Sequence, residues 1–214
     1  MRFFLPLVLL TACGAPAPEA PKAAKPEPTE AKAAATPAAP AAPAAPAAAL
    51  PGLKVDVATS KIQAVGAKVV GKHPIVFKQF DGALELEGES LKAAAFVVQM
   101  ASLEADDPKL TDHLKNADFF DVAKFPTAAF KTTQITAKPG ADGATHEITG
   151  EFEIHGMKKT FTFPAKVAVS AASVTADAKF VLDRKDFGVT YPGMKDNLIQ
   201  DNVEMTLSLT APRS

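Results

Sequence analysis

The clearest pattern in the chain is the alternation of apolar and polar side chains toward its carboxyl end. Stretches 146–155, 159–169, 174–182 and 203–209 place an apolar or small residue at every second position, with mostly polar residues between them. This period of two predicts strands with one apolar and one solvated face, and such strands belong to antiparallel sheets. A weaker form of the same pattern predicts earlier strands at 60–70, 83–87, 93–103 and 127–135.

One short helix is expected in the middle of the chain. Asp107 is a favourable N-cap and Pro108 suits the first helical position, so the helix begins there and runs to about Lys115. Segments 140–143 and 155–158 contain residues typical of turns between strands. Eight strands and one short helix predict an all-β domain, either an eight-stranded antiparallel barrel or a sandwich, and the period alone does not distinguish the two.

A change in composition divides the chain after residue 50. Residues 14–50 contain 18 Ala and 9 Pro, whereas 12 of the 14 Phe lie beyond them. Such a segment buries little apolar area and its prolines oppose a helix, so 13–50 is predicted to be a disordered Ala/Pro-rich linker. At about 3.1 Å per residue, the linker could reach on the order of 100 Å. The folded domain is expected at 51–214, which is long enough for a real core.

The amino terminus has the features of an export signal. Met1-Arg2 precedes an apolar run that ends in Leu10-Thr11-Ala12-Cys13. These four residues resemble the lipobox of bacterial lipoproteins, in which the signal (here 1–12) is removed and the cysteine carries fatty acyl chains such as palmitate. The alternative is an ordinary signal followed by an incidental cysteine. Gly14, the residue after the cysteine, resembles the residue found there in lipoproteins sent to the outer membrane. In a Gram-negative host the chain is therefore expected to be anchored in the outer membrane, with its domain in the periplasm.

Charge and polar residues exclude several classes of function. Residues 51–214 carry 19 Lys and Arg against 21 Asp and Glu, a net charge of −2 without the basic face that nucleic acid requires. The four histidines, His73, His113, His146 and His155, have no metal-site spacing, and no catalytic set is apparent, so neither a metal nor an enzyme is predicted. His113 is expected to hydrogen-bond the loop after it, and His155 to face solvent.

Several runs in the middle of the chain point to a known family. They are Phe80-Asp81-Gly82, Leu110–Lys115, Asp118–Pro126, Thr149–Lys159 and Asp183–Val189. In this order they resemble the YceI-like family over residues 53–211. The family usually has an aromatic or apolar residue in the first strand where this chain has Ala64, and Lys72-His73-Pro74 interrupts the region that follows. The resemblance implies a lipocalin-like antiparallel barrel, exported to the periplasm, that binds polyisoprenoid chains such as quinones or polyprenyl lipids, with no other cofactor.

Inward-facing apolar residues are the candidates for contact with such a lipid. Two further features concern the mouth of the barrel: Arg184 and Lys185 either meet a pyrophosphate headgroup or are solvated loop charges, and 187–200 is either a lid or a plug. The predicted ligand-binding residues are Phe96, Val98, Met100, Phe130, Phe152, Ile154, Phe161, Phe163, Phe180, Leu182, Phe187, Tyr191 and Leu198.

Alternatives to lipid binding remain open at this point. The same inward residues, together with the small Gly150, Ala165, Ala176 and Ala178, also suit a filled, tapering core. The chain would then be a periplasmic stress-response or protein-interaction module without a ligand. An enzyme that acts on quinones or other lipids is a third hypothesis, and whether the chain forms a homodimer is left open.

Overall fold

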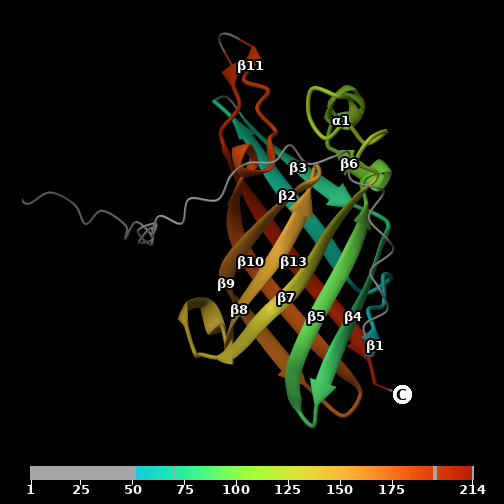
Figure 1. Cartoon of the computed structure of the whole chain (residues 1–214), viewed down its shortest axis with the longest axis vertical. Helices are drawn as coiled ribbons and strands as arrows, with labels where there is room; N and C mark the ends of the chain where they lie inside the picture. Colours follow the sequence, from blue (N-terminus) through green and yellow to red (C-terminus); the bar gives the residue numbers. More distant parts are fainter. Residues whose placement is uncertain (1–51, 70, 195–196, 214) are drawn as a thin grey trace, which may run out of the picture. The chain divides into compact units, whose positions relative to one another are not determined.

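The alternating stretches of the sequence form the strands of one curled antiparallel sheet (Figure 1). The computed structural model describes residues 52–69, 71–194 and 197–213. In strand β8 (His146–Ile154), Ile148, Gly150 and Phe152 are buried and the residues between them are more exposed, as the alternation predicts. The predicted signal at 1–12 and the linker at 13–50, including Cys13, lie outside the described residues.

The described part of the chain is built mainly from strands, with one α-helix and three short 3-10 helices, labelled η. The elements are β1 (Leu53–Lys54), β2 (Lys61–Lys68), β3 (Gly71–Phe77), β4 (Phe80–Glu87), β5 (Ser90–Gln99), η1 (Met100–Ser102), β6 (Leu103–Ala105), α1 (Pro108–Lys115), β7 (Thr127–Ala137), η2 (Ala141–Gly143), β8, β9 (Met157–Val169), β10 (Ser173–Asp183), η3 (Arg184–Phe187), β11 (Gly193–Met194), β12 (Asn197–Leu198) and β13 (Asn202–Pro212). No helix within the described ranges has the length and apolar character needed to cross a membrane.

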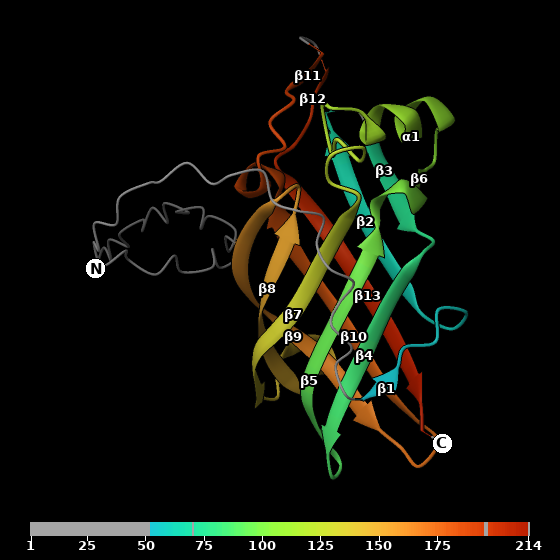
Figure 2. The same ribbon diagram turned by 45° about the vertical axis from the view of Figure 1, so that its right-hand side comes forward.

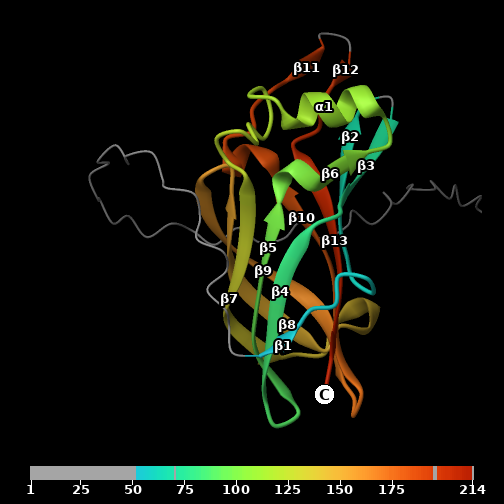
Figure 3. The ribbon, with the colours of Figure 1, turned by 90° about the vertical axis from the view of Figure 1, so that its right-hand side faces the viewer.

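The main sheet curls until its two edges come close to each other. Its strands follow the order β1-β4-β5-β7-β8-β9-β10-β13-β2-β3-β6, and neighbouring strands are antiparallel. After β5 the chain passes through η1 into β6, which pairs with β3 at the other end of this order. At the opposite edge, the N–H of Val55 donates to the Gly82 carbonyl of β4 (2.9 Å) and that of Asp56 to the Thr210 carbonyl of β13 (2.8 Å). The result is a lipocalin-like barrel, which Figure 2 and Figure 3 show from two further sides.

The number of strands differs from the expected eight, because the main sheet has eleven and β11 pairs with β12 separately. The sequence pattern missed β3, since Lys72, His73 and Pro74 interrupt its alternation. Pro74 pairs with Val65 of β2, whereas β6 pairs only with Ile75–Phe77 on the other side of β3. A proline, which lacks an N–H, is tolerated at such an edge position. Strands β1 and β6 are too short to show alternation.

The two ends of the barrel differ in what covers them. The end with the β4–β5 hairpin and the carboxyl terminus, at the bottom of Figure 1, is called the closed end below. The mouth end, at the top, carries α1, η3 and the β11–β12 hairpin. Helix α1 begins as predicted, because Asp107 Oδ1 accepts hydrogen bonds from the N–H groups of Lys109 (2.7 Å) and Leu110 (3.2 Å).

The closed half of the barrel is a filled core. The Phe163 and Phe180 rings stack with their centroids 4.2 Å apart. Ala165, Ala176 and Ala178 are 2%, 9% and 9% exposed, and none of them lines the cavity described below. A Cβ at Gly150 would lie 2.4 Å from Phe130 Cε2 and 2.7 Å from the Lys131 carbonyl oxygen, so only glycine fits there. These small residues therefore suit a tapering core and do not enlarge the cavity of the mouth half.

Candidate functional site

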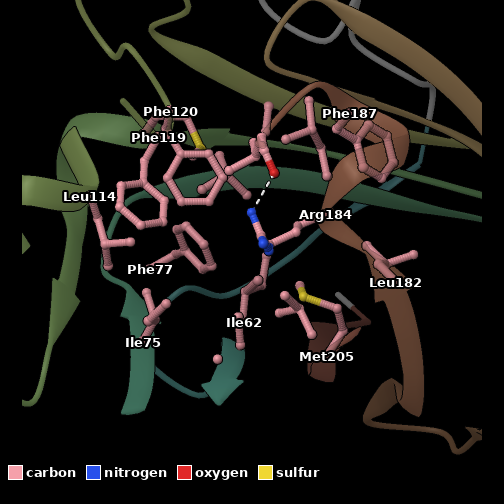
Figure 4. A pocket seen from close by; sticks show the side chains of 18 of the residues that line it. Ile62, Ile75, Phe77, Leu114, Phe119, Phe120, Leu182, Arg184, Phe187 and Met205 are labelled. Atoms are coloured by element: carbon pink, nitrogen blue, oxygen red, sulfur yellow. Dashed lines mark hydrogen bonds between the residues drawn. The ribbon is translucent and has the colours of Figure 1, made fainter. Parts of the chain in front are cut away.

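An apolar cavity occupies the mouth half of the barrel (Figure 4). Its volume is ≈ 140 Å³, and the surface it presents is entirely apolar. Ligand pockets usually measure about 300–1,000 Å³, whereas a dry apolar cavity of about 150 Å³ binds a molecule as small as benzene. The cavity as it stands therefore has room for a short apolar group but not for a complete long chain.

Small residues in two walls make the space. Ala64, Gly66 and Ala67 on β2 line the cavity, as do Ala128 and Ala129 on β7. Larger apolar side chains complete the walls from β2, β3, β5, β8, β10 and β13. These are Ile62, Ile75, Phe77, Phe96, Val98, Ile154, Leu182, Val203 and Met205.

Helix α1 and the loop that follows it form a roof over the cavity. Leu110 and Leu114, four residues apart on one face of α1, line it together with Phe119 and Phe120 of the loop. The loop folds back on the helix because the N–H of Phe120 donates to the Leu114 carbonyl (3.2 Å). The apolar stripe of this short helix thus covers the mouth end of the barrel.

An aromatic contact joins the roof to the segment between β10 and β13. The rings of His113, Phe119 and Tyr191 lie pairwise with their centroids 5.0 Å apart. His113 Nε2 also lies 3.4 Å from Asp118 Oδ2, so His113 contacts the following loop through a close charge contact in place of the expected hydrogen bond. Phe187, Val189 and Ile199 line the cavity, so the segment predicted as a lid or plug does belong to the mouth.

Phenylalanine rings form the floor of the cavity. Phe96 and Phe152 line it, and Phe130 lies behind them, 5.1 Å from Phe96 and 4.4 Å from Phe152 between ring centroids. Phe152 is 3% exposed. The floor separates the cavity from the filled closed half, and so limits how deep an apolar chain can enter.

Arg184 is a buried structural residue of the mouth. It is 8% exposed, and Figure 4 shows its side chain among the cavity residues. Its Nη1 donates to the carbonyls of Val189 (2.7 Å) and Tyr191 (2.9 Å). Its Nε donates to the Gln200 carbonyl (3.2 Å), and Nη2 donates to the Ile199 carbonyl (3.4 Å) and Asp201 Oδ1 (3.0 Å).

These contacts correct both roles considered for Arg184. A guanidinium has five N–H donors, and the five contacts engage all of them, so the side chain is neither a solvated loop charge nor a free partner for a headgroup. Instead, it ties both arms of the 189–201 segment together. Lys185, half-exposed, donates to Asp201 Oδ2 (2.8 Å). This hydrogen bond holds the pKa of the Asp201 carboxyl below its usual range, and the charges of Lys185 and Arg184 act in the same direction.

The structure brings part of the predicted site together. Seven of the predicted residues line the cavity: Phe96, Val98, Met100, Phe152, Ile154, Leu182 and Phe187. Four others, Phe130, Phe161, Phe163 and Phe180, pack on Phe152 from outside the cavity. Tyr191 lies against the roof, and Leu198 is 52% exposed. The contact of all these side chains with a ligand stays a prediction.

The sequence prediction missed the roof and the β2–β3 wall. The roof had a usable signal, because Leu110 and Leu114 have helical spacing and Phe119 and Phe120 follow closely. In the wall, Ala64 was marked only by its departure from the family pattern, and Gly66 and Ala67 had no signal, since small residues by themselves do not indicate a cavity.

Polar clusters offer no alternative centre in the described part of the chain. No group of three or more His, Cys, Asp or Glu side chains there could hold a metal ion. Glu151 and Glu153 both contact Lys158 Nζ, at 3.0 and 3.5 Å, which raises the pKa of that lysine. His155 is partly buried against Phe125 and bonded to the Phe187 carbonyl (3.1 Å), so its expected exposure to solvent is wrong.

Sequence comparisons match the domain as a whole. The YceI-like domain model matches residues 53–211. A UPF0312 protein of Pseudomonas putida is 30% identical over 125 residues, which cover 55% of this chain and 64% of the relative. A UPF0312 protein of Enterobacter is 31% identical over 124 residues, or 53% and 62% of the two chains. The chain thus spans less than two thirds of the length of these curated relatives.

Solved structures share the fold. The crystal structure of BcnA from Burkholderia cenocepacia has a TM-score of 0.65 and 26% identity, covering 73% of this chain and 99% of BcnA. A polyisoprenoid binding domain from Saccharophagus degradans, implicated in plant cell wall breakdown, has a TM-score of 0.61 and covers 76% of this chain and 99% of that domain. At 13% identity, the second likeness shows a common fold only.

Proposed function

The chain belongs to the YceI-like domain family, and we propose that its barrel binds the tail of an isoprenoid-type lipid, a quinone or a polyprenyl lipid, in the cavity of the mouth half. The observation that carries this proposal is the entirely apolar surface of that cavity. The polyisoprenoid binding domain from Saccharophagus degradans, which has the same fold, supports it. We propose binding without turnover, because the walls present apolar surface and the guanidinium of Arg184 is engaged by the chain itself.

The chemistry of the walls determines which part of the lipid they recognise. Burial of hydrocarbon stabilises a complex by about 0.8 kcal/mol per CH₂ group and has no directional requirement. A branched prenyl chain therefore binds through its apolar surface, and its headgroup stays at or outside the mouth. A chain that needs more space than the ≈ 140 Å³ of the cavity must displace the roof of Leu110, Leu114, Phe119 and Phe120 or extend out of the mouth.

A second function is favoured by a different observation, the small volume of the cavity. A barrel whose closed half is filled, and whose mouth half holds only ≈ 140 Å³, suits a stress-response or protein-interaction module without a ligand. One experiment distinguishes the two functions. Filling the cavity should remove lipid binding if the chain binds a lipid there, whereas a module without a ligand has no such binding to lose.

Replacement of Ala64 by Phe tests the proposed site. Ala64 is 5% exposed and lines the cavity on β2, so a ring at this position occupies the space of the ligand. We expect Ala64→Phe to weaken the binding of a fluorescent prenyl chain by at least about tenfold, with the folded state retained in circular dichroism.

Gln63→Phe is the matched control, because the neighbouring residue of a strand points to the opposite face of the sheet. It introduces the same side chain outside the cavity and should leave binding unchanged. Equal binding by Ala64→Phe and the unsubstituted chain would place the ligand elsewhere and remove the site proposed here.

We further propose that the domain is tethered in the cell envelope, at the outer membrane of a Gram-negative host, through lipid on Cys13. The support is the lipobox-like Leu10–Cys13, since two acyl chains anchor a protein where one is marginal. A linker that reaches on the order of 100 Å exceeds the roughly 36 Å of an 11-residue strand such as β13. An anchored domain could therefore turn either end toward the membrane.

Cys13→Ser tests the anchor. Serine cannot be acylated through sulfur, so we expect the variant to move from the membrane fraction to the soluble periplasmic fraction, as followed by immunoblot of fractionated cells. Membrane association equal to that of the unsubstituted chain would eliminate the anchor, while leaving the proposal about the barrel untouched.

A further inference from the structure

An exposed apolar tip stands at the mouth end of the barrel. Val69, at the end of β2, is 68% exposed, and Leu198 of β12 is 52% exposed. The two belong to one tip, because the N–H of Val69 donates to the Leu198 carbonyl (3.3 Å). Figure 3 shows the ends of β2 and β12 at the same end of the barrel as α1. Two large apolar side chains are thus presented to solvent side by side.

The tip borders the cavity. Three residues next to the exposed pair line the cavity. They are Ala67 and Lys68, which precede Val69 in the chain, and Ile199, which follows Leu198. The N–H of Gln200 donates to the Ala67 carbonyl (2.8 Å), and Lys68 is bridged to Ile199. Any surface that covers the tip therefore adjoins the lining of the cavity.

Lysines flank the tip. Lys68 and Lys72 lie on either side of the β2–β3 turn, and neither has an ion-pair partner among residues 52–69, 71–194 and 197–213. Three carboxylates of the mouth end already have partners: Asp106 lies 3.0 Å from His73, Glu204 pairs with Lys179 (3.0 Å), and Asp201 pairs with Lys185 and Arg184. The ammonium groups of Lys68 and Lys72 are therefore available to an anionic surface.

A bilayer fits these features better than a protein partner. A stable protein interface buries more than about 1,000 Å² with good complementarity, whereas this tip offers two apolar side chains. Apolar residues that enter the headgroup region, flanked by lysines that face anionic lipid, are typical of membrane-interface contacts. We propose that the tip of Val69 and Leu198, with Lys68 and Lys72 beside it, docks on an anionic lipid surface, so that the cavity takes its chain directly from the membrane. This inference rests on the proposed function.

Vesicle partition of the full chain carrying Cys13→Ser, which removes the proposed anchor, tests the docking surface. The vesicles are phosphatidylcholine alone or phosphatidylcholine with phosphatidylglycerol. We expect binding to the anionic vesicles only, at least about tenfold weaker partition for Val69→Asp, and a similar loss of the rate at which a fluorescent prenyl chain leaves those vesicles. Val57→Asp is the matched control, because Val57 is 39% exposed and precedes β2 at the opposite end of that strand.

Binding of the same chain from detergent micelles separates the two proposals. Val69 does not line the cavity, so Val69→Asp and the parent should bind equally from micelles. The docking surface is overturned if Val69→Asp leaves the partition of the protein into vesicles unchanged, or if that partition does not require anionic lipid. This holds even if binding of the prenyl chain from micelles is normal. Failure of the parent to bind from micelles, with vesicle partition as expected, refutes the lipid-binding function instead.

Discussion

Phe152→Ala is expected to lower the free energy of unfolding by about 4 kcal/mol and to extend the cavity toward the closed end. Phe152 is 3% exposed. Its ring centroid lies 4.4, 5.7 and 6.0 Å from those of Phe130, Phe180 and Phe161. Removal of the ring takes away these contacts and leaves an unfilled space next to the existing cavity, which neighbouring side chains fill only in part.

Two measurements follow from this single change. Urea denaturation should show the loss of stability, and a series of prenyl alcohols of increasing length should show a longer preferred chain than for the unsubstituted protein. Phe152→Leu is the control, since it keeps an apolar side chain in the floor and should lose less stability without lengthening the preferred chain. If Phe152→Ala is destabilised but its preferred chain length is unchanged, the floor does not limit the depth of the site.

Arg184→Leu is expected to lower the free energy of unfolding by about 3 kcal/mol and to loosen the mouth. The substitution leaves four backbone carbonyls, those of Val189, Tyr191, Ile199 and Gln200, without the donor that now satisfies them. It also removes one of the two cationic partners of Asp201. Because the Val189 carbonyl is buried and the other three bonds are partly buried, the loss of their donor is costly, and the 189–201 segment should then exchange between this form and more open ones.

Hydrogen exchange distinguishes this local role from a general loss of stability. Amides within 189–201 should lose protection first, while those of β8 and β9 stay protected under native conditions. Arg184→Lys, which keeps the charge but has three donors on one nitrogen in place of a planar fork, should fall between Leu and Arg. Uniform loss of protection across the barrel would mean that Arg184 contributes to global stability only.

The sequence was sufficient to predict most of the fold, because the elements that carry it have strong local signals. Alternation predicted β8, β9, β10 and β13, and the Asp107-Pro108 cap predicted where α1 begins. Strand β3 could not be recognised, because Pro74 is tolerated only through its place beside the short β6. That place depends on a pairing between segments far apart in the chain.

The candidate site was predicted only in part, for a different physical reason. Alternation shows which face of a strand points inward but not how far along the barrel a residue lies. Phe152 and Phe163 both alternate correctly, yet Phe152 lines the cavity and Phe163 lies in the filled half behind it. The charge of Arg184 suggested that its side chain faces solvent. Its burial is explained by residues 189–201, which fold back and accept hydrogen bonds from its guanidinium.

The proposed anchor and the proposed docking tip agree in placing the mouth of the barrel at a membrane. A lipid on Cys13 would keep the domain near the bilayer, and the tip of Val69 and Leu198 would orient the mouth toward it. The two proposals predict independent effects, because Cys13→Ser changes the amount of protein at the membrane and Val69→Asp changes the transfer of the chain.

Native mass spectrometry of the chain purified from bacterial envelopes is the decisive test of lipid binding by the barrel. We expect a mass above that of the protein, an increment that organic extraction releases and that matches a prenyl chain, and the loss of this increment in Ala64→Phe. A bare protein mass that stays bare after incubation with quinones and polyprenyl lipids would contradict lipid binding and would favour the interaction module with a filled core.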